Sequence, residues 1–328
     1  MKKLMVFAMA AMVALASCTK TELVDNSAPT PISLKAVTGK MTKAEQTSNN
    51  FLQDLGVIAY VHNTSDLYFD NAKFIKKSET VTNDGGGSST VTYWDGGKYW
   101  PFESSLNFVV YSPYNAATTY NYANSTLSVS NVNITPDLGD DQLLDMGDQI
   151  DYLYGSEYFK GIDEDSDQLP DGYDKNSGNV ATTLKHASAK LTLSFKGSDV
   201  VIKSVSIKDA VFEGSYVVTY PTGVAVWDYE ETQNVTKLNW ESAPLTNEPT
   251  ENSISVMVVP TTAPDVKIRY RITGTQTDLD ANITLSDQLV AGCEHTYVIT
   301  VTPRAIQFGN PSINGWGTGT ATNPPTIN

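Results

Sequence analysis

The stretch Lys267–Ile272, which reads KIRYRI, alternates charged and apolar side chains along the chain. Because successive side chains of a β-strand point to opposite faces of its sheet, this pattern predicts a strand with one solvated and one buried face. Lys190–Phe195 and Leu55–Val61 alternate in a similar way, whereas Ile254–Val259 and Tyr297–Val301 are more apolar on both faces, as in the core of a β-sandwich. Helical periodicity is almost absent, so the sequence predicts an all-β fold.

Turn-forming residues separate these stretches and set the predicted domain organisation. They occur at Asp84–Gly87, Asp95–Gly97, Asp171–Gly172, Pro221–Gly223 and Asn247–Pro249. Many short strands between such turns are typical of β-sandwiches. An acidic stretch poor in apolar residues ends near residue 179, where we place a domain boundary. The predicted regions are a spacer with a possible removable strand at 18–45, sandwich domains at 46–179 and 180–309, and a flexible tail at 310–328.

The first residues have the pattern of an export signal. Lys2 and Lys3 precede the apolar run Leu4–Ala16, which is shorter than the roughly 20 residues that a membrane-spanning helix needs. Small residues then lead to Cys18, as in the lipobox of bacterial lipoproteins, where the cysteine thiol accepts a lipid. We predict that residues 1–17 are a signal peptide and that lipid on Cys18 holds the chain in a membrane. An ordinary signal peptide that contains a cysteine is the alternative.

Charge and cysteine content exclude several classes of protein. The formal net charge is -15, and it becomes -17 once Lys2 and Lys3 leave with the signal peptide. So acidic a chain repels nucleic acid, which excludes nucleic-acid partners. Besides Cys18 the sequence contains only Cys293, so we expect no disulfide among the folded residues and a buried, unreactive Cys293.

A set of motifs in a fixed order is similar to a known family. The motifs are Phe51–Tyr60, Tyr93-Trp94, Lys98–Pro101, Leu106–Tyr114, Asp151–Gly155, His186–Leu191, Gly292–Tyr297 and Asn314–Trp316. Together they resemble the fimbrillin-like proteins of Bacteroidetes, which are subunits of donor-strand (type V) fimbriae. The resemblance implies two tandem transthyretin-like antiparallel β-sandwich domains and a lipoprotein precursor. It also implies that a trypsin-like protease removes an N-terminal strand after Arg or Lys, and that the next subunit donates a strand into the vacated groove.

The sequence offers candidates for both parts of this mechanism. Ile32–Val37 alternates loosely and could be the removable strand. Lys43, followed by Ala44, lies where the family is cleaved, with Lys40 as the second candidate; the family more commonly has Arg at this position. The alternative is that these lysines are exposed loop charges and that the chain keeps its lipid and its first strand.

An acidic loop is a calcium candidate. Counted from Asp163, the side chains of Asp163, Asp165, Asp167, Asp171 and Asp174 occupy positions 1, 3, 5, 9 and 12 of a loop, which suits an ion that takes six to eight oxygen ligands. However, Gln168 stands where such loops need glycine, and a solvated acidic loop explains the same residues. We therefore predict no cofactor.

Aromatic residues gather between Trp94 and Tyr122. Trp94, Tyr99, Trp100 and Tyr111 are followed by Tyr114, Tyr120 and Tyr122. Such rings could stack on sugars, although packing between strands is the more common use of aromatic residues in this pattern.

Catalytic signatures are missing from the sequence. His62, His186 and His295 have no zinc-like spacing, and no nucleophile or phosphate-loop motif occurs. We therefore predict that the protein is not an enzyme. The expected function is a structural or adhesive subunit of a fimbria at the outer membrane and cell surface, with other subunits as partners. The alternative is a monomeric outer-membrane lipoprotein that binds a glycan or a host ligand.

Overall fold

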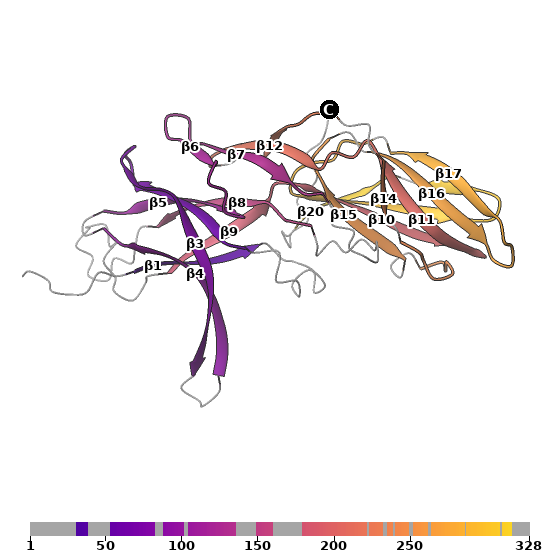
Figure 1. Ribbon diagram of the computed structural model, residues 1–328, viewed down its shortest axis with the longest axis horizontal. Helices are drawn as coiled ribbons and strands as arrows, with labels where there is room; N and C mark the ends of the chain where they lie inside the picture. The colour runs from indigo at the N-terminus through magenta and orange to yellow at the C-terminus, as the bar shows by residue number, and fades with distance from the viewer. Residues whose placement is uncertain are drawn as a thin grey trace, which may run out of the picture.

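The computed structural model describes residues 31–38, 53–82, 88–101, 104–135, 149–159, 179–221, 223–231, 235–238, 240–248, 252–261, 264–285, 287–308 and 310–316. Within these residues every regular element is a β-strand, which confirms the all-β prediction. Nowhere in this part of the chain is there a helix of the length and apolar character needed to span a membrane. The molecule is elongated, with the strands of the N-terminal half gathered at one end and those of the C-terminal half at the other (Figure 1).

The N-terminal half is a closed sheet of seven strands among the described residues. Their order is β1-β4-β3-β2-β5-β8-β9, and β9 pairs with β1 to close the sheet. All neighbours are antiparallel except β1 and β9, which are parallel. The strands are β1 (Pro31–Thr38), β2 (Leu55–Val61), β3 (Leu67–Thr82), β4 (Ser88–Tyr99), β5 (Leu106–Ser112), β8 (Leu153–Phe159) and β9 (Asn179–His186). The predicted domain boundary near residue 179 lies at the start of β9, which itself belongs to this closed sheet and not to the sheets of the C-terminal half.

The C-terminal half contains two further sheets. One has the order β15-β10-β18-β19, with β20 also paired to β18, and the other has the order β14-β11-β16-β17. The first sheet contains β10 (Ala189–Gly197), β15 (Ser253–Val258), β18 (Cys293–Val301), β19 (Ile306–Phe308) and β20 (Ser312–Gly315). The second contains β11 (Val200–Lys208), β14 (Val235–Leu238), β16 (Asp265–Ile272) and β17 (Asp278–Thr284).

A fourth sheet combines strands from both halves. Its order is β13-β12-β7-β6, with β6 (Thr119–Asn121) and β7 (Thr126–Asn133) preceding β8, and β12 (Glu213–Thr219) and β13 (Val226–Asp228) following β11. The polar side chain of Gln149 adds to this connection, because its Nε2 donates to the carbonyl oxygens of Ile134 (2.7 Å) and Met257 (2.9 Å). The two halves are therefore joined by backbone pairing and by buried hydrogen bonds.

The stretch KIRYRI forms most of β16 and shows how the alternation works. Val266 and Ile268 are buried, whereas Lys267 and Arg269 are exposed and bind Asp280 of β17 at 2.9 and 3.0 Å. The sequence pattern therefore identified both the strand and its solvated face.

Two hydrophobic clusters form the core. The smaller lies inside the closed sheet, and the larger extends from Ile58 and Val109 through Leu127 of β7 to the strands of the C-terminal half. Since the larger cluster spans both halves, they pack on one another instead of forming separate cores. The assignment of two tandem transthyretin-like sandwiches remains a prediction.

One expected turn lies inside a strand. Asp95–Gly97 was predicted as a turn, but it belongs to β4, where the pairing with β1 shifts register between Pro31 and Ser33. Gly97 has a φ of 62°, and its N–H donates to Oδ1 of Asp95 at 2.8 Å. Next to it, a Cβ on Gly96 would lie 2.4 Å from the ring of Phe74. The turn-forming residues therefore make a β-bulge that lets β4 continue past a buried ring.

Candidate functional site

β1, the predicted removable strand, completes the closed sheet. It pairs with β4 on one side, where Leu34 is opposite Trp94, and with β9 on the other, where Ser33 through Thr38 are opposite Asn179 through Leu184. Without β1, both β4 and β9 would have an unpaired edge. A sheet edge with free N–H and C=O groups is a template for another strand.

The inward side chains of β1 are part of the core. Ile32 and Leu34 have no exposed surface, whereas Lys35 is exposed, so the side chains alternate as the sequence predicts. Their neighbours in the small cluster include Phe74, Val180 and Leu184. Burying an Ile or Leu side chain contributes about 1.5–3 kcal/mol, so these two residues hold β1 firmly and would leave two apolar pockets behind.

Several residues of the predicted aromatic cluster serve packing. Trp94 is 2% exposed, and its Nε1 donates to the carbonyl oxygen of Gln53 at 2.8 Å. Trp100 packs edge-on against Phe108, with ring centroids 5.7 Å apart. Tyr111 is buried, and its hydroxyl donates to the carbonyl oxygen of Asn115 at 2.8 Å. These contacts favour the packing interpretation for this part of the aromatic cluster.

Other predicted site residues lie outside the described residues. They are Cys18, Lys40, Lys43, Ala44 and the calcium candidates Asp163, Asp165, Asp167, Asp171 and Asp174. In the part of the chain that the structure describes, no group of three or more His, Cys, Asp or Glu side chains could hold a metal ion.

The histidines occupy three separate structural positions. His62 Nδ1 lies 3.2 Å from Oδ1 of Asn107, and Nε2 of His295 accepts a hydrogen bond from the backbone of Val290 at 3.0 Å. His186 Nδ1 lies 2.7 Å from Oδ2 of Asp151, and both side chains are fully buried. Burial lowers the pKa of His295 to about 4, although nearby Asp287 acts in the opposite direction. All three histidines thus have local partners within the fold.

The contact between His186 and Trp316 was not predicted from the sequence. The two rings stack with centroids 3.7 Å apart and an angle of 8° between their planes. The predicted tail begins at residue 310, and the structure pairs residues 312–315 with β18 and buries Trp316. Asp151, His186 and Trp316 lie far apart in the sequence and share no short motif. The contacts of His186 with the other two residues are therefore visible only in the folded chain.

The side chain of Cys293 is half-buried at the start of β18. Burial raises the pKa of its thiol. A raised pKa keeps the thiol protonated and therefore a poor nucleophile.

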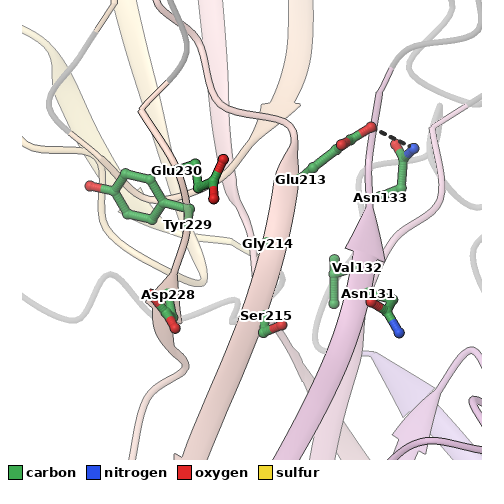
Figure 2. A pocket seen from close by; sticks show the side chains of 9 residues that line it. All are labelled: Asn131, Val132, Asn133, Glu213, Gly214, Ser215, Asp228, Tyr229 and Glu230. Carbon is green, nitrogen blue, oxygen red and sulfur yellow. Dashed lines mark hydrogen bonds between the residues drawn. The ribbon is translucent and has the colours of Figure 1, made fainter.

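A polar cleft of about 540 Å³ opens beside the sheet shared by the two halves. Figure 2 shows the side chains of Glu213, Asp228 and Glu230 around Gly214, and the hydrogen bond that Nδ2 of Asn133 donates to Glu213 at 2.9 Å. The cleft is lined by carboxylates, amides and one tyrosine, Tyr229, so its character is acidic.

Comparison with known proteins identifies relatives of this fold. None of the curated proteins compared with the chain matches it. Among solved structures, a candidate cell adhesion protein from Bacteroides ovatus has 17% identity and a TM-score of 0.52, over 88% of this chain and 99% of its own. A second candidate cell adhesion protein, from Bacteroides uniformis, has 17% identity and a TM-score of 0.49, over 87% and 98% of the two chains. The tip fimbrial protein Mfa3 from Porphyromonas gingivalis, truncated at its C-terminus, has 13% identity and a TM-score of 0.43, over 87% and 99%.

The likeness to the Bacteroides ovatus protein supports a common fold over most of both chains. The family assignment comes from the sequence itself, because a model of the fimbrillin-like family matches residues 42–316. That match contains all the motifs on which the resemblance was based. The chain therefore belongs to the fimbrillin-like family.

Proposed function

We propose that the protein is a structural or adhesive subunit of a bacterial surface fimbria, exported as a lipoprotein and assembled by β-strand donation. The observation that carries the proposal is the position of β1, which lies between β4 and β9 and inserts Ile32 and Leu34 into the core. Loss of this one strand would open two sheet edges and two apolar pockets in the same place.

The groove defines what a donated strand must provide. The strand must run parallel to β9 and antiparallel to β4, as β1 does. It must also carry apolar side chains two residues apart to replace Ile32 and Leu34. Backbone hydrogen bonds then supply affinity, and the fit of the alternate side chains supplies specificity.

Export and trimming complete the proposed route. Lipid on Cys18 carries the chain to the outer membrane, and cleavage between Lys43 and Ala44 releases both the lipid and β1. An uncleaved chain keeps Cys18 and stays at the cell surface as an anchor. We also propose a signal peptide at 1–17, no enzymatic role, and two tandem transthyretin-like domains at 46–179 and 180–309. Separate sheets in the C-terminal half favour a second domain, although β9 (Asn179–His186) still belongs to the closed sheet of the N-terminal half.

Cleavage and assembly can be tested together in cells that produce the full chain. We expect material sheared from the cell surface to begin at Ala44 by mass spectrometry and to form ladders that resist mild denaturant. Lys43→Gln should leave the chain uncut, lipidated and monomeric, whereas the matched variant Lys40→Gln should still be cut and assembled. Trimmed protein that remains monomeric under all conditions would contradict strand donation.

A second candidate function is a monomeric outer-membrane lipoprotein that binds a glycan or a host ligand. It is favoured by a cavity lined with tyrosine side chains on the described surface. Binding by uncut monomers with no ladder formation would support this candidate over the fimbrial subunit.

A further inference from the structure

A cavity of about 300 Å³ lies where the closed sheet meets the sheet shared by the two halves. In Figure 1 this is the region of β5, β6 and β8. Its walls come from segments far apart in the sequence and include Tyr60, Asn107, Tyr120, Ser125, Ser156 and Tyr220. A volume of this size is at the lower end of the range for small-ligand sites, which often form where parts of a protein meet.

Tyrosine rings dominate one side of the cavity. Tyr60 and Tyr120 stack with centroids 5.8 Å apart, and Tyr120 lies 6.4 Å from Tyr220. Tyr122 packs edge-on against Tyr120, with ring centroids 4.9 Å apart. Tyr60, Tyr120 and Tyr220 are only partly buried, and all three line the cavity.

Hydrogen bonds between the walls hold this arrangement. The backbone N–H of Tyr220 donates to the carbonyl oxygen of Ser125 at 2.9 Å, and its hydroxyl donates to the carbonyl oxygen of Gly155 at 3.1 Å. Asn107 is oriented by its contact with His62. Because the walls are fixed before binding, a ligand would lose less free energy in ordering them.

The chemistry of the lining selects the kind of ligand. The described residues that line the cavity include no Asp, Glu, Lys or Arg, although the whole chain has a net charge of -15. An ionic ligand would therefore have no counter-charge in the lining. Tyrosine rings offer faces for C–H groups, while the amide of Asn107 and the hydroxyls of Ser125 and Ser156 can donate to and accept from hydroxyl groups. A sugar ring has apolar C–H faces and a rim of hydroxyl groups, so it matches both the tyrosine rings and the polar side chains of the lining.

We propose that this cavity binds one or two rings of a neutral saccharide. A C–H face of the sugar stacks on the tyrosines, and its hydroxyl groups bind Asn107 and the two serines. An aromatic site for a quaternary ammonium group would use the same rings, but the lining has no carboxylate to balance that charge. The proposal rests on the glycan-binding function given above as the second candidate, and names its site and the class of ligand. The site requires neither removal of β1 nor assembly, so it can be measured on the uncut monomer.

The full chain is tested on an array of neutral oligosaccharides that contain galactose, glucose, mannose, fucose and N-acetylglucosamine. Sialylated forms of these oligosaccharides serve as the anionic comparison. Binding of choline is measured separately as the cationic comparison. Binding to a neutral glycan is expected, and its affinity is then measured by calorimetry. Tyr120→Ala should weaken it by about tenfold or more, whereas Tyr120→Phe, which keeps the ring, should change it by less than about threefold.

Two further variants make the result specific. Ser156→Phe should abolish binding by filling the cavity, with the melting temperature used to verify that the variant is folded. Tyr99→Ala removes an exposed tyrosine outside the cavity and should leave binding unchanged. Absence of neutral-glycan binding, preference for choline, or equal loss in Tyr99→Ala and Tyr120→Ala would overturn the proposal. None of these outcomes bears on ladder formation, so the saccharide site and strand donation can fail separately.

Discussion

β1 and β20 are the first and last strands of the described chain, and the fold holds them in different ways. β1 has a neighbour on each side and inserts two fully buried side chains, Ile32 and Leu34. β20 pairs with β18, exposes Ser312 and Asn314, and is followed by one buried ring, Trp316. β1 is thus anchored along its length and β20 mainly at its end. Loss of β1 would leave a shaped groove, whereas loss of β20 would leave one edge of β18.

The largest expected change in stability comes from shortening a buried side chain of β1, and it tests whether the core anchors this strand. Leu34→Ala removes buried atoms and leaves a cavity, so it should lower the free energy of unfolding by about 2–5 kcal/mol. The neighbouring Lys35→Ala is the matched control, because Lys35 is exposed and should change stability by less than about 0.5 kcal/mol. Equilibrium denaturation of the uncut chain measures both. Equal, small effects would mean that β1 is not held by its buried side chains.

A smaller loss of stability, centred on β18 and β20, is expected when the pH falls. His295 of β18 lies opposite Ile313 of β20, and burial lowers its pKa from 6.5 to about 4. The unfolded chain therefore binds a proton that the folded chain excludes between these values. The titration of His295 should therefore leave the free energy of unfolding unchanged above pH 6.5. It should lower that free energy by up to about 2–3 kcal/mol as the pH falls to 4.

Two measurements locate this acid effect. His295→Gln should remove this part of the pH dependence, as measured by denaturation at pH 7 and pH 4.5. Hydrogen exchange should show faster opening of β18 and β20 at the lower pH, with β1 less affected. If the variant keeps the full pH dependence of the original chain, the loss of stability comes from other groups.

The smallest effect concerns the charges beside β1. Lys77 and Asp95 form an ion pair of 2.5 Å on β3 and β4, and Asp95 lies opposite Ser33. Because Lys77 is exposed and Asp95 is partly exposed, water screens the pair, and Lys77→Met should change the free energy of unfolding far less than Leu34→Ala does. A loss as large as that of Leu34→Ala would show that charge, and not the core, retains β1.

Local patterns explain what the sequence could predict. Alternation in Lys267–Ile272 and in Ile32–Val37 identifies strands because it reflects which face of a sheet is buried, and both stretches are strands in the structure. The resemblance also identified the family, since its motifs are spread along most of the chain and the family model matches nearly the same region. The lipid on Cys18 and the cut at Lys43 remain predictions.

Contacts between distant residues explain what the sequence could not predict. Asp95–Gly97 has turn chemistry, but its role as a bulge depends on the ring of Phe74 from another strand. The stack of Trp316 on His186 joins residues far apart in the sequence. The proposed saccharide cavity likewise brings together Tyr60, Tyr120 and Tyr220. The aromatic cluster noted in the sequence contains Tyr120 but neither Tyr60 nor Tyr220.

The two-sided pairing of β1 also has a mechanical consequence. Its hydrogen bonds to β4 and β9 run across the strand, so a force directed along the strand shears both ladders at once. Peeling the strand from one end would instead break its bonds one after another. A strand seated in this groove and pulled lengthwise therefore shares the load over its whole length, which suits a joint under tension.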